Sequence, residues 1–336
     1  MSASGSCLVL GSNSFSGSHY CAHLIAKGWT VFGCSRSPEP HPAFLPYTWA
    51  ETTAGDAGRF EFHQIDLNRD LDRLMALIER GRIGHVVNFA AQSMVAESWK
   101  NPDHWFMTNV VSTVRLHERL RACSFLERYV HVSTPEVYGS TGGSIDEEAP
   151  FNPSTPYAVS RAAADMSLRT YFNAYRFPVV FTRAANVFGP GQQLYRIVPR
   201  AILFFLTGRK LQLHGGGHSV RSFIHIRDVC DATERVMLSG SAGRAYHIST
   251  ERMISIADLV RVICEKLGVA FDGCVELVGE RLGKDAAYSL DSRRVRSELG
   301  WRDAVSLEQG IDETIAWVRR WLPDLERQAL DYVHKP

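Results

Sequence analysis

Short apolar runs alternate with segments whose apolar residues recur at helical spacing through the first half of the chain. The first such unit has an apolar run at 7–10, a Gly/Ser loop, apolar positions at helical spacing over 19–27, and a second apolar run at 30–34. This pattern is typical of a strand, a helix and a second strand. Because neighbouring parallel strands need a crossover helix, the pattern predicts an α/β fold built on a doubly wound parallel sheet.

The same alternation continues along the chain. Further strands are predicted at 60–66, 85–91, 129–133 and 179–185, and helices at 71–80, around 110–121 and at 156–175.

The alternation loosens from about residue 189, and the helices predicted there lie at 198–206, 256–267 and 307–322. A chain of 336 residues exceeds the usual reach of one hydrophobic core, which favours two lobes. We therefore expect a main lobe over 1–188 and a smaller mixed α/β substrate-binding lobe over 189–336. Part of 219–250, namely the apolar segments 223–228 and 246–250, is expected to return to the main sheet.

Charge and cysteine content narrow the class of protein. Lys and Arg total 37 against 36 for Asp and Glu, so no net field attracts nucleic acid or an acidic membrane. The seven cysteines include no C-x-x-C pair, which favours reduced thiols without a metal site. No window approaches the roughly 18 apolar residues of a membrane span, and no leader-like segment opens the sequence. A cytoplasmic protein is expected.

The loop after the first strand carries a glycine pattern suited to a dinucleotide. Gly11 and Gly17 would let the backbone approach a pyrophosphate at the N-terminus of the following helix, although Ser14 occupies the middle glycine position. This predicts a Rossmann-type NAD(P) site in the main lobe. The predicted loop contacts are Gly11, Ser14, Phe15, Ser16 and Gly17.

The second strand is followed by Ser35 and Arg36 in place of an acidic residue. An acidic residue there would bind the ribose hydroxyls of NAD, whereas an arginine can pair with the 2′-phosphate of NADP. NADP is therefore favoured, and NAD remains possible. Asp66 and Leu67, after the third strand, would suit the adenine.

A second constellation follows the fifth strand. Tyr157 and Arg161 are four residues apart, which places them on one face of a helix, where the cation can lower the phenol pKa and allow it to act as a base. Thr134 and Glu136 lie where the fifth strand ends.

Here the chain resembles the extended short-chain dehydrogenases, and within them the nucleotide-sugar 4,6-dehydratases acting on dTDP-glucose or GDP-mannose. The motifs that carry the resemblance stand in the family's order at 90–93, 133–139, 150–157, 183–190 and 298–301.

The resemblance implies a reaction on a nucleotide-diphosphate sugar. Tyr157, assisted by Thr134, would remove the O4 proton while hydride leaves C4, and Glu136 would take the C5 proton and help expel the C6 hydroxyl as water. Arg161 stands where relatives usually have Lys, and Pro135 where dTDP-glucose dehydratases have Asp. Glu136 would then serve as both base and acid.

The resemblance also implies binding residues and a homodimer formed through two helices at about 104–122 and 156–175. The remaining cofactor contacts would be Ala90, Ala91, Gln92 and Asn109, together with Tyr157 and Arg161. The substrate contacts would be Ser93, Thr134, Asn186, Val198, Leu211, Leu213, His214, Arg221, Arg281 and Asp285.

Other functions remain open on the same scaffold. A 4-epimerase needs only the hydride shuttle and usually lacks the glutamate, so Glu136 speaks against it, whereas an NDP-uronate decarboxylase also carries that glutamate. A non-catalytic dinucleotide sensor would fit the unusual residues Ser14, Arg161 and Pro135, but the presence of Tyr157 argues for catalysis.

Overall fold

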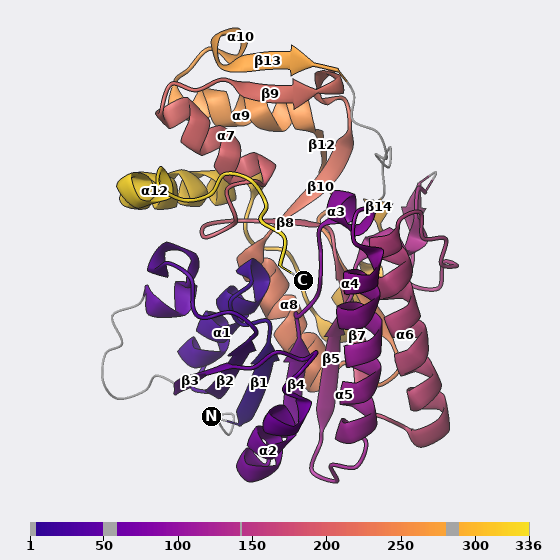
Figure 1. Cartoon of the computed structure of the whole chain (residues 1–336). Helices are drawn as coiled ribbons and strands as arrows, with labels where there is room; N and C mark the ends of the chain where they lie inside the picture. Colours follow the sequence, from indigo (N-terminus) through magenta and orange to yellow (C-terminus); the bar gives the residue numbers. More distant parts are fainter. Residues whose placement is uncertain (1–4, 50–58, 142, 280–288, 336) are drawn as a thin grey trace.

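The computed structural model describes residues 5–49, 59–141, 143–279 and 289–335. Its main element is a seven-stranded sheet in which every neighbouring pair of strands is parallel (Figure 1). The order reverses between β1 and β4, and such a switch point is where open α/β sheets bind ligands. In sheet order the strands are β3 (Phe60–Gln64), β2 (Thr30–Ser35), β1 (Ser6–Leu10), β4 (His85–Asn88), β5 (Arg128–Val132), β7 (Val179–Ala184) and β11 (Ala245–Ile248).

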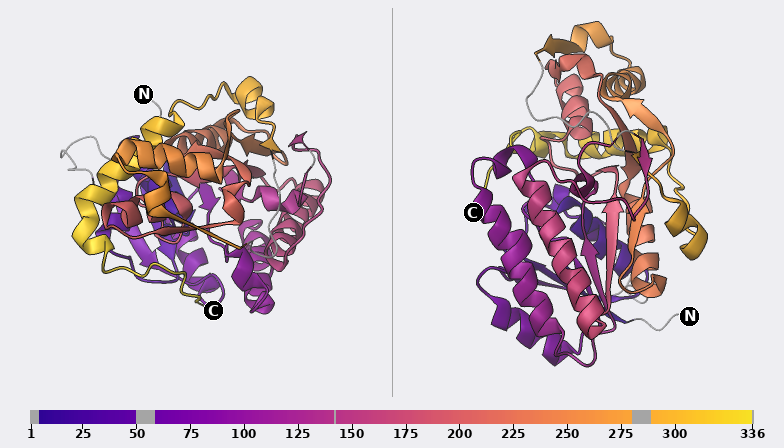
Figure 2. Two further views of the ribbon diagram at one scale, coloured as in Figure 1. Left: turned by 90° about the horizontal axis from the view of Figure 1, so that it is seen from above. Right: turned by 90° about the vertical axis from the view of Figure 1, so that its right-hand side faces the viewer.

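Helices cover both faces of this sheet, as the right-hand view of Figure 2 shows. The alternation of strand side chains explains why: Cys7 and Val9 of β1 belong to the core under one layer, and Leu8 and Leu10 to the core under the other. The first layer contains α1 (Phe15–Ala26), α8 (Ile226–Ser239) and α11 (Arg293–Leu299). The second contains α2 (Leu71–Gly81), α5 (Ser112–Leu120) and α6 (Pro156–Tyr175).

The helix that precedes β5 is not uniformly α-helical. It begins as α4 (Pro102–Phe106), continues through a π-helical turn at Met107–Val111, and ends as α5. The short α3 (Val95–Ser98) precedes it. A π turn is rare and often marks a functional site.

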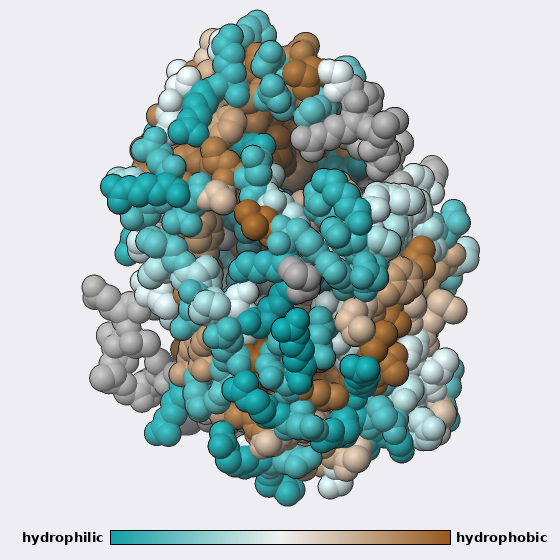
Figure 3. Space-filling model, viewed as in Figure 1, coloured by the Kyte–Doolittle hydropathy of each residue, from teal (hydrophilic) through white to brown (hydrophobic). Residues whose placement is uncertain are grey.

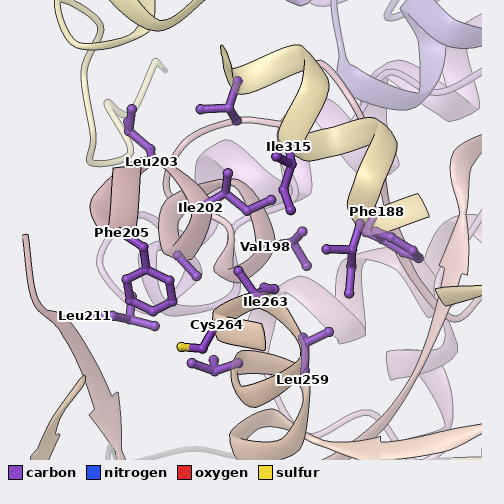
Figure 4. Packing of buried hydrophobic residues seen from close by; sticks show 14 of the residues in the cluster. Phe188, Val198, Ile202, Leu203, Phe205, Leu211, Leu259, Ile263, Cys264 and Ile315 are labelled. Carbon is purple, nitrogen blue, oxygen red and sulfur yellow. The ribbon is translucent and has the colours of Figure 1, made fainter. Parts of the chain in front are cut away.

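The smaller lobe packs α7 (Ile197–Leu206), α9 (Ile256–Leu267) and α12 (Leu307–Leu325) around a core of its own. Ile202, Ile263 and Ile315 come from these three helices and meet in that core (Figure 4). Strands β9 (Leu211–His214) and β13 (Val275–Val278) cover it. The other short elements are α10 (Phe271–Cys274), β6 (Ser144–Ile145), β14 (Ser289–Leu290) and single 3-10 turns at Pro42–Phe44, Pro46–Thr48, Pro135–Tyr138 and Gly215–Gly217.

A three-stranded sheet joins the lobes, made of β8 (Asn186–Phe188), β10 (Val220–His225) and β12 (Met253–Ser255). Of the two segments expected to return to the main sheet, 246–250 does so as part of β11. The other does not, because β10 pairs with β8 and β12 in the three-stranded sheet, and after His225 the chain enters α8.

The α/β class with its parallel sheet is confirmed, and the division at residue 188 stays a prediction. In the portions of the chain that the structure describes, none of the helices has the length and apolarity needed to cross a bilayer. The cytoplasmic location stays a prediction as well.

Candidate active site

Two neighbouring hollows lie at the carboxyl ends of the main strands. The larger, about 690 Å³, is lined by residues of both lobes, and the smaller, about 180 Å³, lies beside the ends of β1, β2 and β3. The larger one collects the predicted residues Ser14, Phe15, Ser16, Ala91, Ser93, Thr134, Glu136, Tyr157, Arg161, Asn186, Val198 and Arg221. The smaller one collects Gly11, Ser14, Ser35, Arg36, Asp66, Leu67, Ala90, Ala91 and Gln92.

The loop between β1 and α1 has the backbone geometry of a pyrophosphate cradle. Gly11 has φ +79°, and a Cβ there would lie 2.8 Å from the backbone nitrogen of Ala90. A Cβ on Gly17 would overlap the carbonyl oxygen of Gly11. Both positions therefore require glycine, and the residues present fit a dinucleotide at the N-terminus of α1.

Ser14 fits the same loop for a different reason. Its φ is −75°, a conformation open to any residue, and its hydroxyl accepts from Gly17 N at 3.1 Å as the N-cap of α1. Glycine is not needed at this position, and serine is among the preferred N-caps. The departure from the glycine pattern thus leaves the cradle intact.

The polar residues after β2 and β3 shape the smaller hollow. Ser35 Oγ accepts from Asn13 N at 3.0 Å, which holds the glycine loop to the end of β2. Arg36 is half-buried, and its Nη2 donates to Lys335 O at 2.9 Å. Asp66 Oδ1 accepts from Asn68 N at 2.9 Å, so this carboxylate also shapes the turn after β3.

Asn109 acts on the cofactor region through Gln92. It is fully buried in the π turn and lines neither hollow. Its Oδ1 accepts from Gln92 N at 2.9 Å, and its Nδ2 donates to Gln92 O at 3.0 Å and to Ser160 Oγ at 2.9 Å. The predicted direct cofactor contact is therefore replaced by a positioning role for the loop after β4.

Thr134 and Glu136 are held by a 3-10 turn that follows β5. Thr134 is its N-cap and accepts from Glu136 N at 3.3 Å. Pro135 occupies the first position of the turn, where its fixed φ is favourable and its missing N–H costs nothing. The proline thus has a structural role that an acid at this position would not fill.

Tyr157 lies in the first turn of α6 and is 8% exposed. Burial has the largest effect on its phenol and raises the pKa, and the Glu136 charge raises it as well. Three groups lower the pKa: the charge of Arg161, a hydrogen bond with Thr134 and the charge of Arg196. The net direction is upward. The two cations and the threonine thus favour the phenolate that a base at this position needs.

Arg161 is 3% exposed and points from α6 toward the end of β5. Its Nη2 donates to Val132 O and lies 3.4 Å from His131 Nε2. Burial and the Arg161 charge lower the pKa of His131 to about 3, so this imidazole is neutral at physiological pH. Among the described atoms, Arg161 Nε is buried without a hydrogen-bond partner, and the residue Arg161 is part of the lining of the larger hollow.

A buried polar network fixes α6 against the sheet beneath the site. Asp165, two turns after Tyr157, accepts from Ser133 Oγ at 2.8 Å and from Arg183 Nη2 at 2.7 Å. Arg183 Nη1 also donates to Tyr138 OH at 2.7 Å. Asp165 and Arg183 are both 0% exposed, so this ion pair links α6 to β7 inside the core.

The structure corrects the predicted contacts from β9. Leu211 and Leu213 are each 2% exposed and belong to the core of the smaller lobe, because alternate residues of a strand face opposite sides. Neither side chain lines the larger hollow. His214 is half-buried and pairs through Nδ1 with Gly279 O at 3.2 Å, and its predicted contact with the substrate stays a prediction. Arg281 and Asp285 lie outside the described residues.

Several residues of the larger hollow were not predicted. Gln192, Tyr195 and Arg196 come from the loop between β8 and α7, and Ser219 and Ile256 from the connecting sheet region. The glycine-rich start of this loop at 189–191 was the available signal. Among the described residues, no group of three His, Cys, Asp or Glu is arranged to hold a metal ion.

Comparison with known proteins agrees with this geometry. The family model of GDP-mannose 4,6 dehydratase matches residues 8–314. A dTDP-glucose 4,6-dehydratase of Streptomyces antibioticus is 33% identical over 335 residues, covering 96% of both chains. The crystal structure of a dTDP-glucose 4,6-dehydratase from Streptomyces venezuelae superimposes with a TM-score of 0.85 at 32% identity, covering 94% of this chain and 97% of that one.

A trifunctional UDP-glucose 4,6-dehydratase, epimerase and reductase of Arabidopsis thaliana is 33% identical over 262 residues. The match covers 77% of this chain but only 39% of that larger protein. The extent of the family match and the full-length similarity to dehydratases lead to one conclusion: this chain belongs to the GDP-mannose 4,6-dehydratase family of extended short-chain dehydrogenases.

Proposed function

We propose that this chain is a nucleotide-sugar 4,6-dehydratase, which converts an NDP-hexose to an NDP-4-keto-6-deoxyhexose. The observation that carries the proposal is that Thr134, Glu136 and Tyr157 line one hollow of about 690 Å³ together with the N-terminus of α1. The dehydratase names of relatives that match nearly the whole chain point the same way.

The side chains divide the reaction between them. Tyr157 accepts the proton of the O4 hydroxyl, with Thr134 hydrogen-bonded to its phenol and Arg161 stabilising the phenolate. A bound nicotinamide supplies the hydride acceptor for C4 and the hydride donor for C6. Glu136 takes the C5 proton, made acidic by the 4-ketone, and donates it to the departing C6 hydroxyl. When hydride reaches C6, C5 takes up one proton, which balances the proton lost from O4.

The diphosphate of the substrate needs donors on the lobe opposite Tyr157. Asn186 and Arg221 line the larger hollow from β8 and β10, and Arg196 joins them from the start of α7. A guanidinium presents two parallel donors to a phosphate, so these arginines suit the role. Val198 and Ser93, which were also predicted to contact the substrate, line the larger hollow as well. The predicted substrate contacts of Arg281 and Asp285 stay predictions.

The cofactor is a nicotinamide dinucleotide, and we propose NADP in preference to NAD. Relatives of known structure contain NAD. In this chain, however, Ser35, Arg36 and Ser37 line the smaller hollow at the end of β2, with no carboxylate among them to bind the ribose hydroxyls of NAD.

Arg36→Ala tests the cofactor preference. The variant is expected to weaken NADP binding about tenfold more than NAD binding, the loss of one charge-assisted hydrogen bond to the phosphate, beyond any effect on both dinucleotides of losing the contact with Lys335 O. Titration calorimetry with both dinucleotides measures this. Equal weakening of both, or tighter binding of NAD than NADP by the unaltered protein, would contradict the preference.

The reaction itself is tested by product mass. Purified protein is incubated with a panel of NDP-hexoses and NDP-uronates and with catalytic amounts of dinucleotide. A product lighter by one water identifies a dehydratase, and a product lighter by carbon dioxide identifies a decarboxylase. A product of unchanged mass with an altered NMR spectrum identifies an epimerase. Dinucleotide binding without turnover of any sugar would support a sensor and overturn the proposal.

We also propose that two copies associate through α4, α5 and α6. Of the described elements here, α4, the π turn that follows it and α6 carry large exposed apolar side chains, and Figure 3 shows apolar surface along the edge where α6 lies. Monomers rarely leave such a patch uncovered. The apolar side chains concerned are Phe106 (38% exposed), Met107 (42%), Val159 (39%), Met166 (58%) and Tyr175 (55%).

A further inference from the structure

The segment 330–335, here called the strap, follows α12 after a short turn, and Figure 1 shows the chain running from α12 in the smaller lobe toward the main lobe, where the C mark lies. Burial alternates along it: Leu330, Tyr332 and His334 are half-buried, while Asp331 and Val333 are exposed. This period of two is typical of an extended segment with one face packed against the protein. No sequence motif predicted it.

The first half of the strap is attached to the smaller lobe. Arg200 of α7 donates to Leu330 O and, at 2.7 Å, to Asp331 Oδ1. The Tyr332 ring packs edge-on against Tyr195, with the centroids 5.7 Å apart. Because Tyr195 lines the larger hollow, the strap adjoins the substrate side of the site.

The second half is attached to the main lobe. The His334 ring stacks on Trp105 and on His104, with centroids 5.1 Å apart in each case. His334 Nε2 also shares a hydrogen bond of 2.8 Å with His104 Nδ1. Trp105 is fully buried, so α4 offers His334 a fixed platform.

The last residue of the strap joins two walls of the smaller hollow. Lys335 O accepts from Gln92 Nε2 at 2.7 Å and from Arg36 Nη2 at 2.9 Å. Lys335 Nζ donates to Ser37 Oγ at 3.1 Å. Gln92 follows β4, Arg36 and Ser37 follow β2, and all three line the hollow that lies between these strand ends. One carbonyl oxygen therefore bridges two residues that line the smaller hollow from different strand ends.

We propose that the strap forms part of the cofactor site and retains the dinucleotide between turnovers. A dinucleotide in the smaller hollow would leave only after the bridge from Arg36 to Gln92 through Lys335 had opened. The inference rests on the proposed function, in which hydride taken from C4 returns to C6 within one cycle. Such a reaction needs no cofactor exchange, so slow release does not limit turnover.

The test uses Tyr332→Ala/His334→Ala, which removes both aromatic anchors, and Val333→Ser as the matched control. Val333 is 66% exposed within the same segment. Protein loaded with NADP is mixed with a large excess of unlabelled competitor, and the dissociation rate of the dinucleotide is followed without any sugar present. The double variant is expected to release it about tenfold faster or more, and the control at the unaltered rate.

The possible outcomes distinguish a failure of the strap proposal from a failure of the proposed function. Equal dissociation rates in the double variant and the unaltered protein, with matching thermal unfolding, would overturn the strap alone. A chain that binds neither dinucleotide would overturn the proposed function and the strap with it. The single variant His334→Ala, expected to show an intermediate rate, tests the same point if the double variant folds poorly.

Discussion

In the proposed reaction, Glu136 carries the step that distinguishes dehydration from a simple hydride shuttle, because only a base near C5 can remove the C5 proton. Glu136→Gln keeps the size of the side chain and removes that base. Dehydration is expected to fall by about 10²-fold or more, while oxidation at C4 continues. Single-turnover absorbance should then show reduced nicotinamide that persists.

The matched control for this variant is Glu148→Gln. Glu148 is exposed and paired with Arg294 at 2.7 Å, outside both hollows. It should retain full activity. Unchanged dehydration by Glu136→Gln would assign the C5 base to another residue.

We propose that Arg161 sets the pH dependence of catalysis through Tyr157. Burial raises the phenol pKa and the Arg161 charge opposes that shift, so removing the charge raises the pKa further. Arg161→Met should therefore move the rising limb of kcat/KM to higher pH, with less phenolate available at any lower pH. Arg161→Lys keeps the charge and should keep the profile. An unshifted profile in Arg161→Met would argue against this role.

At the scale of single residues, the sequence predicted which residues line the reaction site better than it predicted which residues contact one another. The spacing of Tyr157 and Arg161 is meaningful because helix geometry is regular, and both line the larger hollow. The motif after β5 likewise located Thr134 and Glu136. Leu211 and Leu213 failed because a motif does not say which strand face is buried. The sequence predicted that Asn109 belongs to the cofactor region, but not that it acts by holding the backbone of Gln92.

At the scale of elements, one buried ion pair holds α6 in place. Asp165→Asn leaves Arg183 charged, fully buried and without its carboxylate partner. The free energy of unfolding is expected to fall by about 3 kcal/mol, measured by urea denaturation. Asp72→Asn removes a carboxylate that is 91% exposed from its pair with Arg119 and should cost less than about 1 kcal/mol. If the two variants lost equal unfolding free energy, the buried Asp165–Arg183 pair would not hold α6 more strongly than an exposed pair does.

Long elements were predictable and short ones were not. The helices at 156–175 and 256–267 carry enough turns for their periodicity to be evident, and both were found with the same bounds. The strands β8 and β12 have only three residues each, too few for a period of two to stand out. The strap lacks regular secondary structure altogether, and its place depends on contacts with residues far away in the sequence.

At the scale of the whole molecule, the exposed apolar edge of α6 predicts association. Met166→Glu places a charge in the proposed interface and should give a monomer of 37.6 kDa where the unaltered chain gives twice that mass. Size-exclusion chromatography with light scattering measures both. Leu238→Glu, at a side chain on α8 that is 49% exposed, should leave the mass unchanged. A monomeric unaltered chain would contradict the interface.

The π turn at Met107–Val111 behaves as a one-residue insertion in the rod formed by α4 and α5. Deleting one residue from it would let the rod run as continuous α-helix with its two halves close to their present register, because the wide turn accommodates one extra residue. The change would fall within the turn itself, so Asn109 would lose its place opposite the two backbone groups of Gln92, while Trp105 and His104 would keep their contacts with the strap. The irregular turn thus presents Asn109 to the loop after β4, and removing one residue from it should weaken dinucleotide binding while sparing the helix.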